Sequence, residues 1–140
     1  MAFERTIQVM FQHCDAAGIV FYPRYYEMIN QVVEEWFEQG LGTSFVDIHI
    51  KQGDAVPTAK VETEFKKPSE LGDKLLFTLE VTKIGRSSVH LLFTVTCGEE
   101  LRLTSKSVIV YVKGSEKKPA SWPDGIKANL NLFLKEEGPA

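Results

Sequence analysis

The chain has 140 residues, of which 44% are hydrophobic and 25% charged, and its formal net charge is −3. This length suits one domain that buries a core, so we expect a single domain over residues 1–140, and the slight excess of acid gives no reason to expect a nucleic-acid partner. No apolar run approaches the ~20 residues that span a bilayer, and the N-terminus has no signal-peptide core, so we expect a cytoplasmic protein.

The first half of the chain predicts one strand and one long helix. We expect the strand over residues 6–12, followed by a loop in which Gly18 can adopt backbone angles that other residues resist. Pro23 suits the first turn of a helix that should run to about Gln39 and end at Gly40. The helix has a wide apolar face and a narrower stripe of glutamates, which suggests that a sheet embraces it. The apolar face consists of Tyr25, Ile29, Val32, Val33, Trp36 and Phe37.

The second half changes to a period of two, which is typical of strands. After an irregular stretch with room for a short helical turn, we expect strands over residues 55–65, 75–81, 89–97 and 101–112. Glycines and a proline mark the connections between them, at Pro68, Gly72, Gly85 and Gly98. Ser121 is a candidate cap for a final helix with Ile126, Leu130, Phe133 and Leu134 on one face. Together these elements predict an α+β fold, a five-stranded antiparallel sheet wrapped around one long helix.

The loop between the first strand and the long helix carries the most chemistry. It holds one carboxylate, Asp15, among small residues. A carboxylate can attack an activated acyl group or deprotonate water, and the start of a helix offers N–H donors for an anionic intermediate. This combination suggests hydrolysis of an activated acyl group. The alternative is that Asp15 only caps the turn, as many loop aspartates do.

Residues 13–26 resemble a motif of the hotdog-fold acyl-CoA thioesterases of the 4-hydroxybenzoyl-CoA thioesterase type. The pattern Asp-x-Ala-Gly-x-Val-x-Tyr-x-x-Tyr is matched at Asp15, Ala17, Gly18, Val20, Tyr22 and Tyr25. The resemblance implies a hotdog fold, homodimers that share a continuous sheet and pair into tetramers, and active sites at subunit interfaces. It also implies that Asp15 attacks the thioester or activates water, while backbone N–H groups near Tyr22 hold the carbonyl oxygen. No metal or cofactor is expected, because coenzyme A is part of the substrate.

Other residues near the motif are weaker candidates for the substrate pocket. His13 would lie on the same side of an extended chain as Asp15, so it could orient the carboxylate, touch substrate or simply lie at the surface. Tyr22, Gly18 and Tyr25 are assigned to the oxyanion and substrate pocket, although core packing is the alternative for the tyrosine rings. The cysteines, Cys14 and Cys97, lack metal-ligand spacing and are read as reduced thiols, with a bridge between them left open. Cys14 should point away from Asp15 and pack.

Recognition of coenzyme A calls for cations near its phosphates. Arg86, followed by Ser87 and Ser88 in a hairpin, is the best-placed candidate, and Lys60 and Lys106 are assigned with it. Further candidates are Lys66, Lys67 and Arg102, and a solvated strand charge is the alternative for each. The four helix glutamates, Glu27, Glu34, Glu35 and Glu38, are read as solvated or interface charges and not as catalytic groups.

The sequence is compatible with three functions. The first is hydrolysis of an aromatic or a short- to medium-chain acyl-CoA. The second is an acyl-CoA or acyl-carrier-protein binding module without catalysis. The third is an enoyl-CoA hydratase, which needs a paired acid and base, and His13 with Asp15 is the only close pair.

Overall fold

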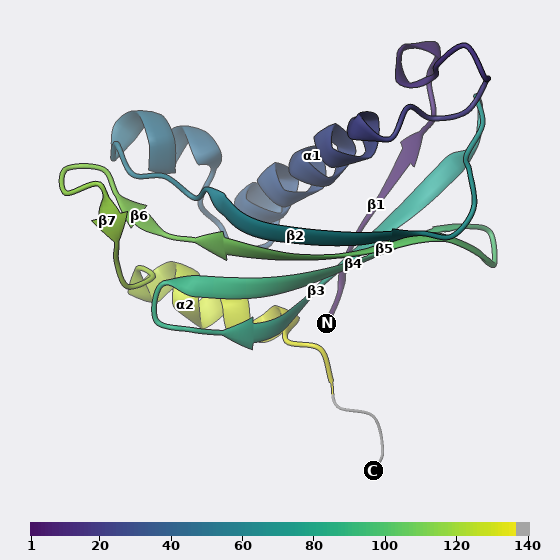
Figure 1. Cartoon of the computed structure of the whole chain (residues 1–140). Helices are drawn as coiled ribbons and strands as arrows, with labels where there is room; N and C mark the ends of the chain where they lie inside the picture. Colours follow the sequence, from purple (N-terminus) through teal and green to yellow (C-terminus); the bar gives the residue numbers. More distant parts are fainter. Residues whose placement is uncertain (137–140) are drawn as a thin grey trace.

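The structure is a computed structural model that describes residues 1–136, and its centre is a five-stranded antiparallel sheet with one long helix against it (Figure 1). The strand order is β1-β3-β4-β5-β2, so β2 and β1 form the two edges. The α+β architecture predicted from the sequence is confirmed. The strands are β1 (Phe3–Gln8), β2 (Thr58–Phe65), β3 (Lys74–Ile84), β4 (Ser88–Cys97) and β5 (Glu100–Val110).

Helix α1 (Pro23–Gln39) begins and ends where the sequence indicated. Its buried face follows the spacing of about 3.6 residues and adds Met28 to the expected apolar residues. The glutamates at 27, 34 and 38 are exposed on the opposite side. At the C-terminal end, the Gly40 N–H donates to the Trp36 carbonyl at 2.7 Å. A Cβ at Gly40 would lie 2.7 Å from Trp36 Cδ1 and 2.9 Å from Phe133 Cζ, so only glycine fits this close approach.

The first strand lies earlier than the expected residues 6–12. β1 pairs with β3 from Phe3 opposite Leu79 to Gln8 opposite Lys74, the first residue of β3. The Val9 N–H still donates to the Asp73 carbonyl at 2.8 Å, and the chain then tightens into a 3-10 turn, η1 (Phe11–His13). Likewise β2 is shorter than residues 55–65, because Pro57 has no N–H for a ladder, and Ala55 forms only an isolated bridge with Val112.

Ser121 does not cap the final helix, although the sequence had suggested it. Helix α2 (Asp124–Leu130) has Pro123 at its N-cap, and Ser121 instead accepts a 3.0 Å hydrogen bond from Arg86 Nε. Ile126 and Leu130 are buried as expected, and Phe133 follows them in the 3-10 turn η3 (Asn131–Phe133). A small hairpin of β6 (Val112–Lys113) and β7 (Lys118–Pro119) was not anticipated, and a short π-helix, η2 (Val46–Lys51), occupies the irregular stretch.

Two segments that connect regular elements lie together at one end of the sheet, and one of them carries Asp15. Residues 66–73, which we call the crossover segment, carry the chain from the edge strand β2 across this end to β3. The loop before α1 lies at the same end, because the Val20 N–H donates to the Ser69 carbonyl at 2.9 Å. In Figure 1 both segments lie beyond the start of α1. Within the described residues, no helix is long and apolar enough to span a membrane.

Candidate active site

Residues 13–22, which we call the acid loop, form a narrow hairpin that presents Asp15. The Phe21 N–H donates to the His13 carbonyl at 2.9 Å, and the Asp15 N–H donates to the Ile19 carbonyl at 3.0 Å. The Gly18 N–H then closes a tight turn onto the Asp15 carbonyl at 3.0 Å. Gly18 has a φ of +81°, a left-handed conformation that glycine adopts without strain. The backbone therefore holds Asp15 in one place at an exposed position.

The Asp15 side chain has one oxygen engaged and one available. Oδ1 accepts a 2.9 Å hydrogen bond from the Ala17 N–H, which is a turn-forming contact. Among the hydrogen bonds of residues 1–136, none reaches Oδ2. Asp15 can therefore both stabilise the turn and act chemically. Its Oδ1 anchors the carboxylate, while Oδ2 remains available to a substrate.

The start of α1 leaves one backbone donor free. Pro23 has no N–H, the Arg24 N–H donates to the Phe21 carbonyl at 2.8 Å, and the Tyr25 N–H donates to the Tyr22 carbonyl at 3.1 Å. The Tyr22 N–H has no acceptor among the described residues. It lies at the positive end of the helix dipole, where a developing negative charge is stabilised. This is the donor that the motif assigned to the carbonyl oxygen.

Aromatic rings surround this helix start. The Phe21 and Tyr22 rings are 5.7 Å apart, and the Tyr22 ring lies 6.3 Å from that of Phe65 at the end of β2. Phe21, Tyr22 and Phe65 are all exposed, whereas Tyr25 is only 4% exposed and packs against Phe65. Tyr25 is therefore a packing residue of the site. Phe65 was not among the site residues expected from the sequence, although it ends β2 on the same face as Val61.

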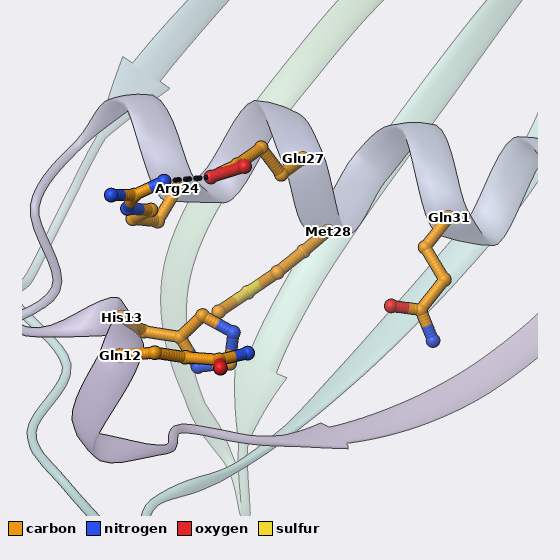
Figure 2. Close-up of a pocket in the computed structure, with 6 residues that line it drawn as sticks. All are labelled: Gln12, His13, Arg24, Glu27, Met28 and Gln31. Atoms are coloured by element: carbon orange, nitrogen blue, oxygen red, sulfur yellow. Dashed lines mark hydrogen bonds and ion pairs between the residues drawn. The ribbon is translucent and has the colours of Figure 1, made fainter.

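His13 faces a different pocket from the one expected. It ends the 3-10 turn η1, so the extended geometry that would have aligned it with Asp15 is wrong. Its Nδ1 accepts the Met10 N–H at 2.8 Å, which places the hydrogen of the neutral ring on Nε2. Figure 2 shows the His13 side chain beside Met28 in a pocket of about 350 Å³ between η1 and α1. Its other lining residues are Gln12, Arg24, Glu27 and Gln31, with Arg24 paired to Glu27 at 2.6 Å.

An apolar groove follows α1 beyond the aromatic rings. It has a volume of about 260 Å³ and is lined by Tyr26, Ile29, Asn30 and Val33 of the helix and by residues of β2 and β5 such as Val61 and Ile109. Tyr26 lies one helical turn after Tyr22, so the groove begins close to the free N–H. The Tyr26 hydroxyl donates to Thr63 Oγ1 at 3.0 Å, and Thr63 is 2.9 Å from Ser105 Oγ.

The basic residues assigned to coenzyme A do not gather at Asp15 within one chain. Arg86, Ser87 and Ser88 lie at the far end of the 11-residue strand β3, roughly 30 Å from the acid loop. Lys60 and Lys106 line a pocket of about 350 Å³ on the face of the sheet opposite α1, together with His90, and Lys60 pairs with Glu62 at 3.0 Å.

The remaining cations divide between two environments. Lys66 and Lys67 follow Phe65 directly and so lie at the end of the sheet that carries the site, where they pair with Glu64 at 2.8 Å and Glu100 at 3.5 Å. Arg102 is nearly buried, with 12% of its side chain exposed, and is held by protein groups. Within residues 1–136, no three metal-ligating side chains cluster together.

Comparison with known proteins identifies the family. A model of the thioesterase-like superfamily matches residues 9–130. A 1,4-dihydroxy-2-naphthoyl-CoA hydrolase from Nostoc punctiforme is 28% identical over 126 residues, which cover 90% of this chain and 84% of that protein. A crystal structure of a 1,4-dihydroxy-2-naphthoyl-CoA thioesterase from Synechocystis aligns with a TM-score of 0.86 at 22% identity, over 94% of this chain and 96% of that one.

The fold is shared more widely than the sequence. A Staphylococcus aureus protein solved in complex with CoA aligns with a TM-score of 0.88 at 16% identity, over 100% of this chain and 90% of that one. The resemblance read from residues 13–26 is therefore confirmed at the level of family and fold. The chain belongs to the thioesterase-like superfamily and has the hotdog fold.

Proposed function

We propose that this protein hydrolyses an acyl-CoA to the free acid and coenzyme A, with Asp15 as the nucleophile or general base. The observation that carries the proposal is that one backbone loop, the acid loop, presents both a carboxylate oxygen of Asp15 and an N–H of Tyr22 that have no hydrogen-bond partner among the described residues. The names of the related hydrolases and the CoA in the Staphylococcus aureus structure support the choice of thiol carrier.

Two routes satisfy this geometry. In the first, Asp15 Oδ2 attacks the thioester carbon, the carbon–sulfur bond breaks, and coenzyme A leaves as a thiolate that takes up a proton. Water then cleaves the mixed anhydride, which releases the acid and restores Asp15. In the second, Asp15 removes a proton from water, and the resulting hydroxide attacks the same carbon. The carbon–sulfur bond then breaks, and the departing coenzyme A thiolate takes the proton back from Asp15. In both routes the Tyr22 N–H and the helix dipole stabilise the oxyanion.

We further propose an aromatic acyl group. The exposed rings of Phe21, Tyr22 and Phe65 offer edge and face contacts to a flat substrate, and the apolar groove beside them supplies space. The groove also contains polar groups, among them Asn30 and Ser107, which could meet ring hydroxyls. The dihydroxynaphthoyl group in the names of the relatives agrees with this chemistry. A short or medium aliphatic chain is the competing substrate class.

We also propose that the working unit is a homo-oligomer, a dimer that pairs into a tetramer. The strand β2 forms one edge of the sheet, and Val61 and Phe65 on it are 45% and 49% exposed. Because Arg86, Ser87 and Ser88 lie far from Asp15 in one chain, their proposed contact with coenzyme A needs a second subunit. Lys60 and Lys106 would likewise act across an interface and not at the Asp15 loop of their own chain.

The test is steady-state thiol release from a panel of acyl-CoA esters. The panel contains benzoyl, hydroxybenzoyl, hydroxynaphthoyl, phenylacetyl and aliphatic groups of increasing length, and Asp15→Asn and Asp124→Asn are assayed beside the wild type. We expect aromatic esters to give the highest kcat/KM, Asp124→Asn to match the wild type, and Asp15→Asn to be inactive. Preference for aliphatic esters would contradict the aromatic proposal, and turnover of no ester would contradict hydrolysis of acyl-CoA.

A binding module is the second candidate, because the Ala17 contact shows that Asp15 also has a structural role. A binder would hold a non-hydrolysable acyl-CoA analogue equally well in the wild type and in the Asp15→Asn variant, and it would show no turnover to lose. The hydratase alternative has less support, since His13 faces the pocket of Figure 2 and its Nδ1 already accepts the Met10 N–H.

A further inference from the structure

The crossover segment is wrapped around one side chain, that of Arg102. The Arg102 carbonyl accepts the N–H groups of Lys66 and Lys67 at 2.8 and 3.1 Å. Its guanidinium Nη1 donates to the Pro68 carbonyl at 3.2 Å, to Ser69 Oγ at 3.0 Å and to Asp73 Oδ2 at 2.8 Å. One residue of β5 therefore holds both ends of the segment and its middle.

The charges around Arg102 strengthen this attachment. The Glu70 N–H and the Arg102 guanidinium together hold the pKa of Asp73 below its ordinary value, and Asp73 in turn raises the pKa of Arg102. Glu100 Oε1 lies 2.8 Å from Arg102 Nε, but at an angle outside that of a hydrogen bond, so this contact is an ion pair alone. A partly buried ion pair with hydrogen bonds orients its partners more strongly than an exposed one.

The crossover segment in turn supports the acid loop. The Val20 N–H donates to the carbonyl of Ser69, a fully buried residue, at 2.9 Å, and Ile19 forms a bridge with Glu70. The Ile19 carbonyl is also the acceptor for the Asp15 N–H. A displacement of Glu70 would therefore shift Ile19 and, with it, Asp15. A displacement of Ser69 would shift Val20 and, with it, the nearby Tyr22 N–H.

We propose that Arg102 is a positioning residue for the hydrolytic site, which sets the distance between the Asp15 carboxylate and the Tyr22 N–H through the crossover segment. The inference rests on the proposed function of Asp15 and Tyr22. It removes Arg102 from the residues available to bind the phosphates of coenzyme A. Lysine cannot replace it fully, because one ammonium group can meet the acceptors of Nη1 but cannot also form the ion pair that Arg102 Nε makes with Glu100.

The experiment compares Arg102→Met with Arg5→Met. Arg5 is a matched control because it is a half-buried β-strand arginine with a 3.0 Å ion pair to Glu35, and its hydrogen bonds within the described residues avoid both loops. Each variant is assayed well below its own unfolding temperature. We expect Arg102→Met to lower kcat at least tenfold with KM changed less than threefold, Arg102→Lys to restore part of kcat, and Arg5→Met to keep kcat within twofold.

Amide hydrogen exchange supplies a readout that needs no catalysis. We expect the Val20 and Asp15 amides to exchange at least tenfold faster in Arg102→Met than in Arg5→Met. Unchanged exchange of these amides together with kcat within twofold of the wild type would overturn the proposal. If no acyl-CoA is hydrolysed by the wild type, the proposed function fails, while exchange in the acid loop still decides the role of Arg102. Should Arg102→Met not fold, Asp73→Asn weakens the same contact and is judged by the same two measurements.

Discussion

Asp15, the proposed nucleophile or general base, also stabilises the turn of its own loop. Because Oδ1 accepts the Ala17 N–H, an asparagine at this position can keep that contact through its amide oxygen while it removes the negative charge. Alanine would remove both. Asp15→Asn is therefore the substitution that separates the chemical role from the structural one, and a loss of activity in it is not explained by a collapsed turn.

At the same scale, Gly18 fixes the turn by its backbone conformation and not by lack of space. Its φ is +81°, and a Cβ there would meet nothing within 4 Å. We predict that Gly18→Ala strains the loop by about 1–2 kcal/mol and lowers kcat, while KM changes less. Thermal unfolding and steady-state kinetics on one acyl-CoA check this. Full activity in Gly18→Ala would show that the loop tolerates another backbone shape.

At the scale of elements, the end of α1 depends on close packing at Gly40. A Cβ there would approach Trp36 Cδ1 and Phe133 Cζ to within 2.9 Å, whereas one at Gly125 in α2 would meet nothing within 4 Å. We predict that Gly40→Ala lowers the free energy of unfolding by about 1–3 kcal/mol. The matched Gly125→Ala should be neutral or stabilising by up to ~1 kcal/mol. Urea unfolding measures both, and equal effects would contradict the packing argument.

Elements with a strong local signal could be predicted from the sequence. Helix α1 has a proline at its start, a glycine at its end and an apolar face between them, and its bounds were correct. The shift of β1 could not be foreseen, because it depends on where the distant strand β3 begins. The motif located the acid loop, but the support from Ser69 and Arg102 comes from residues remote in sequence, and no local pattern marks them.

At the scale of the whole molecule, a buried acid ties the segment between η2 and β2 to the residues that follow β5. Asp54 is 5% exposed, accepts a hydrogen bond from the Tyr111 hydroxyl and another from the Gly114 N–H at 3.0 Å, and lies 4.0 Å from Lys113 Nζ. The Tyr111 hydroxyl, followed by the Gly114 N–H, holds the pKa of Asp54 below its ordinary value of 3.8.

This shift predicts how stability depends on pH. A folded-state pKa below the unfolded one contributes stability that is fully present above pH 3.8 and is lost as the pH falls through the folded value. We predict that Asp54→Asn lowers the free energy of unfolding at neutral pH and flattens its decline in acid. Urea unfolding across this range, with Asp124→Asn as control, tests the prediction. Parallel acid profiles for Asp54→Asn and wild type would contradict it, because the other carboxyls with a lowered pKa, those of Asp47, Glu64 and Asp73, would then account for the slope.

The most direct test of the account is kcat for Asp15→Asn on the best aromatic acyl-CoA, measured on protein whose unfolding temperature matches the wild type. The account predicts a loss on the order of 10³-fold or more, with affinity for a non-hydrolysable analogue retained. A kcat within a few-fold of the wild type would remove Asp15 from the reaction and contradict the central claim.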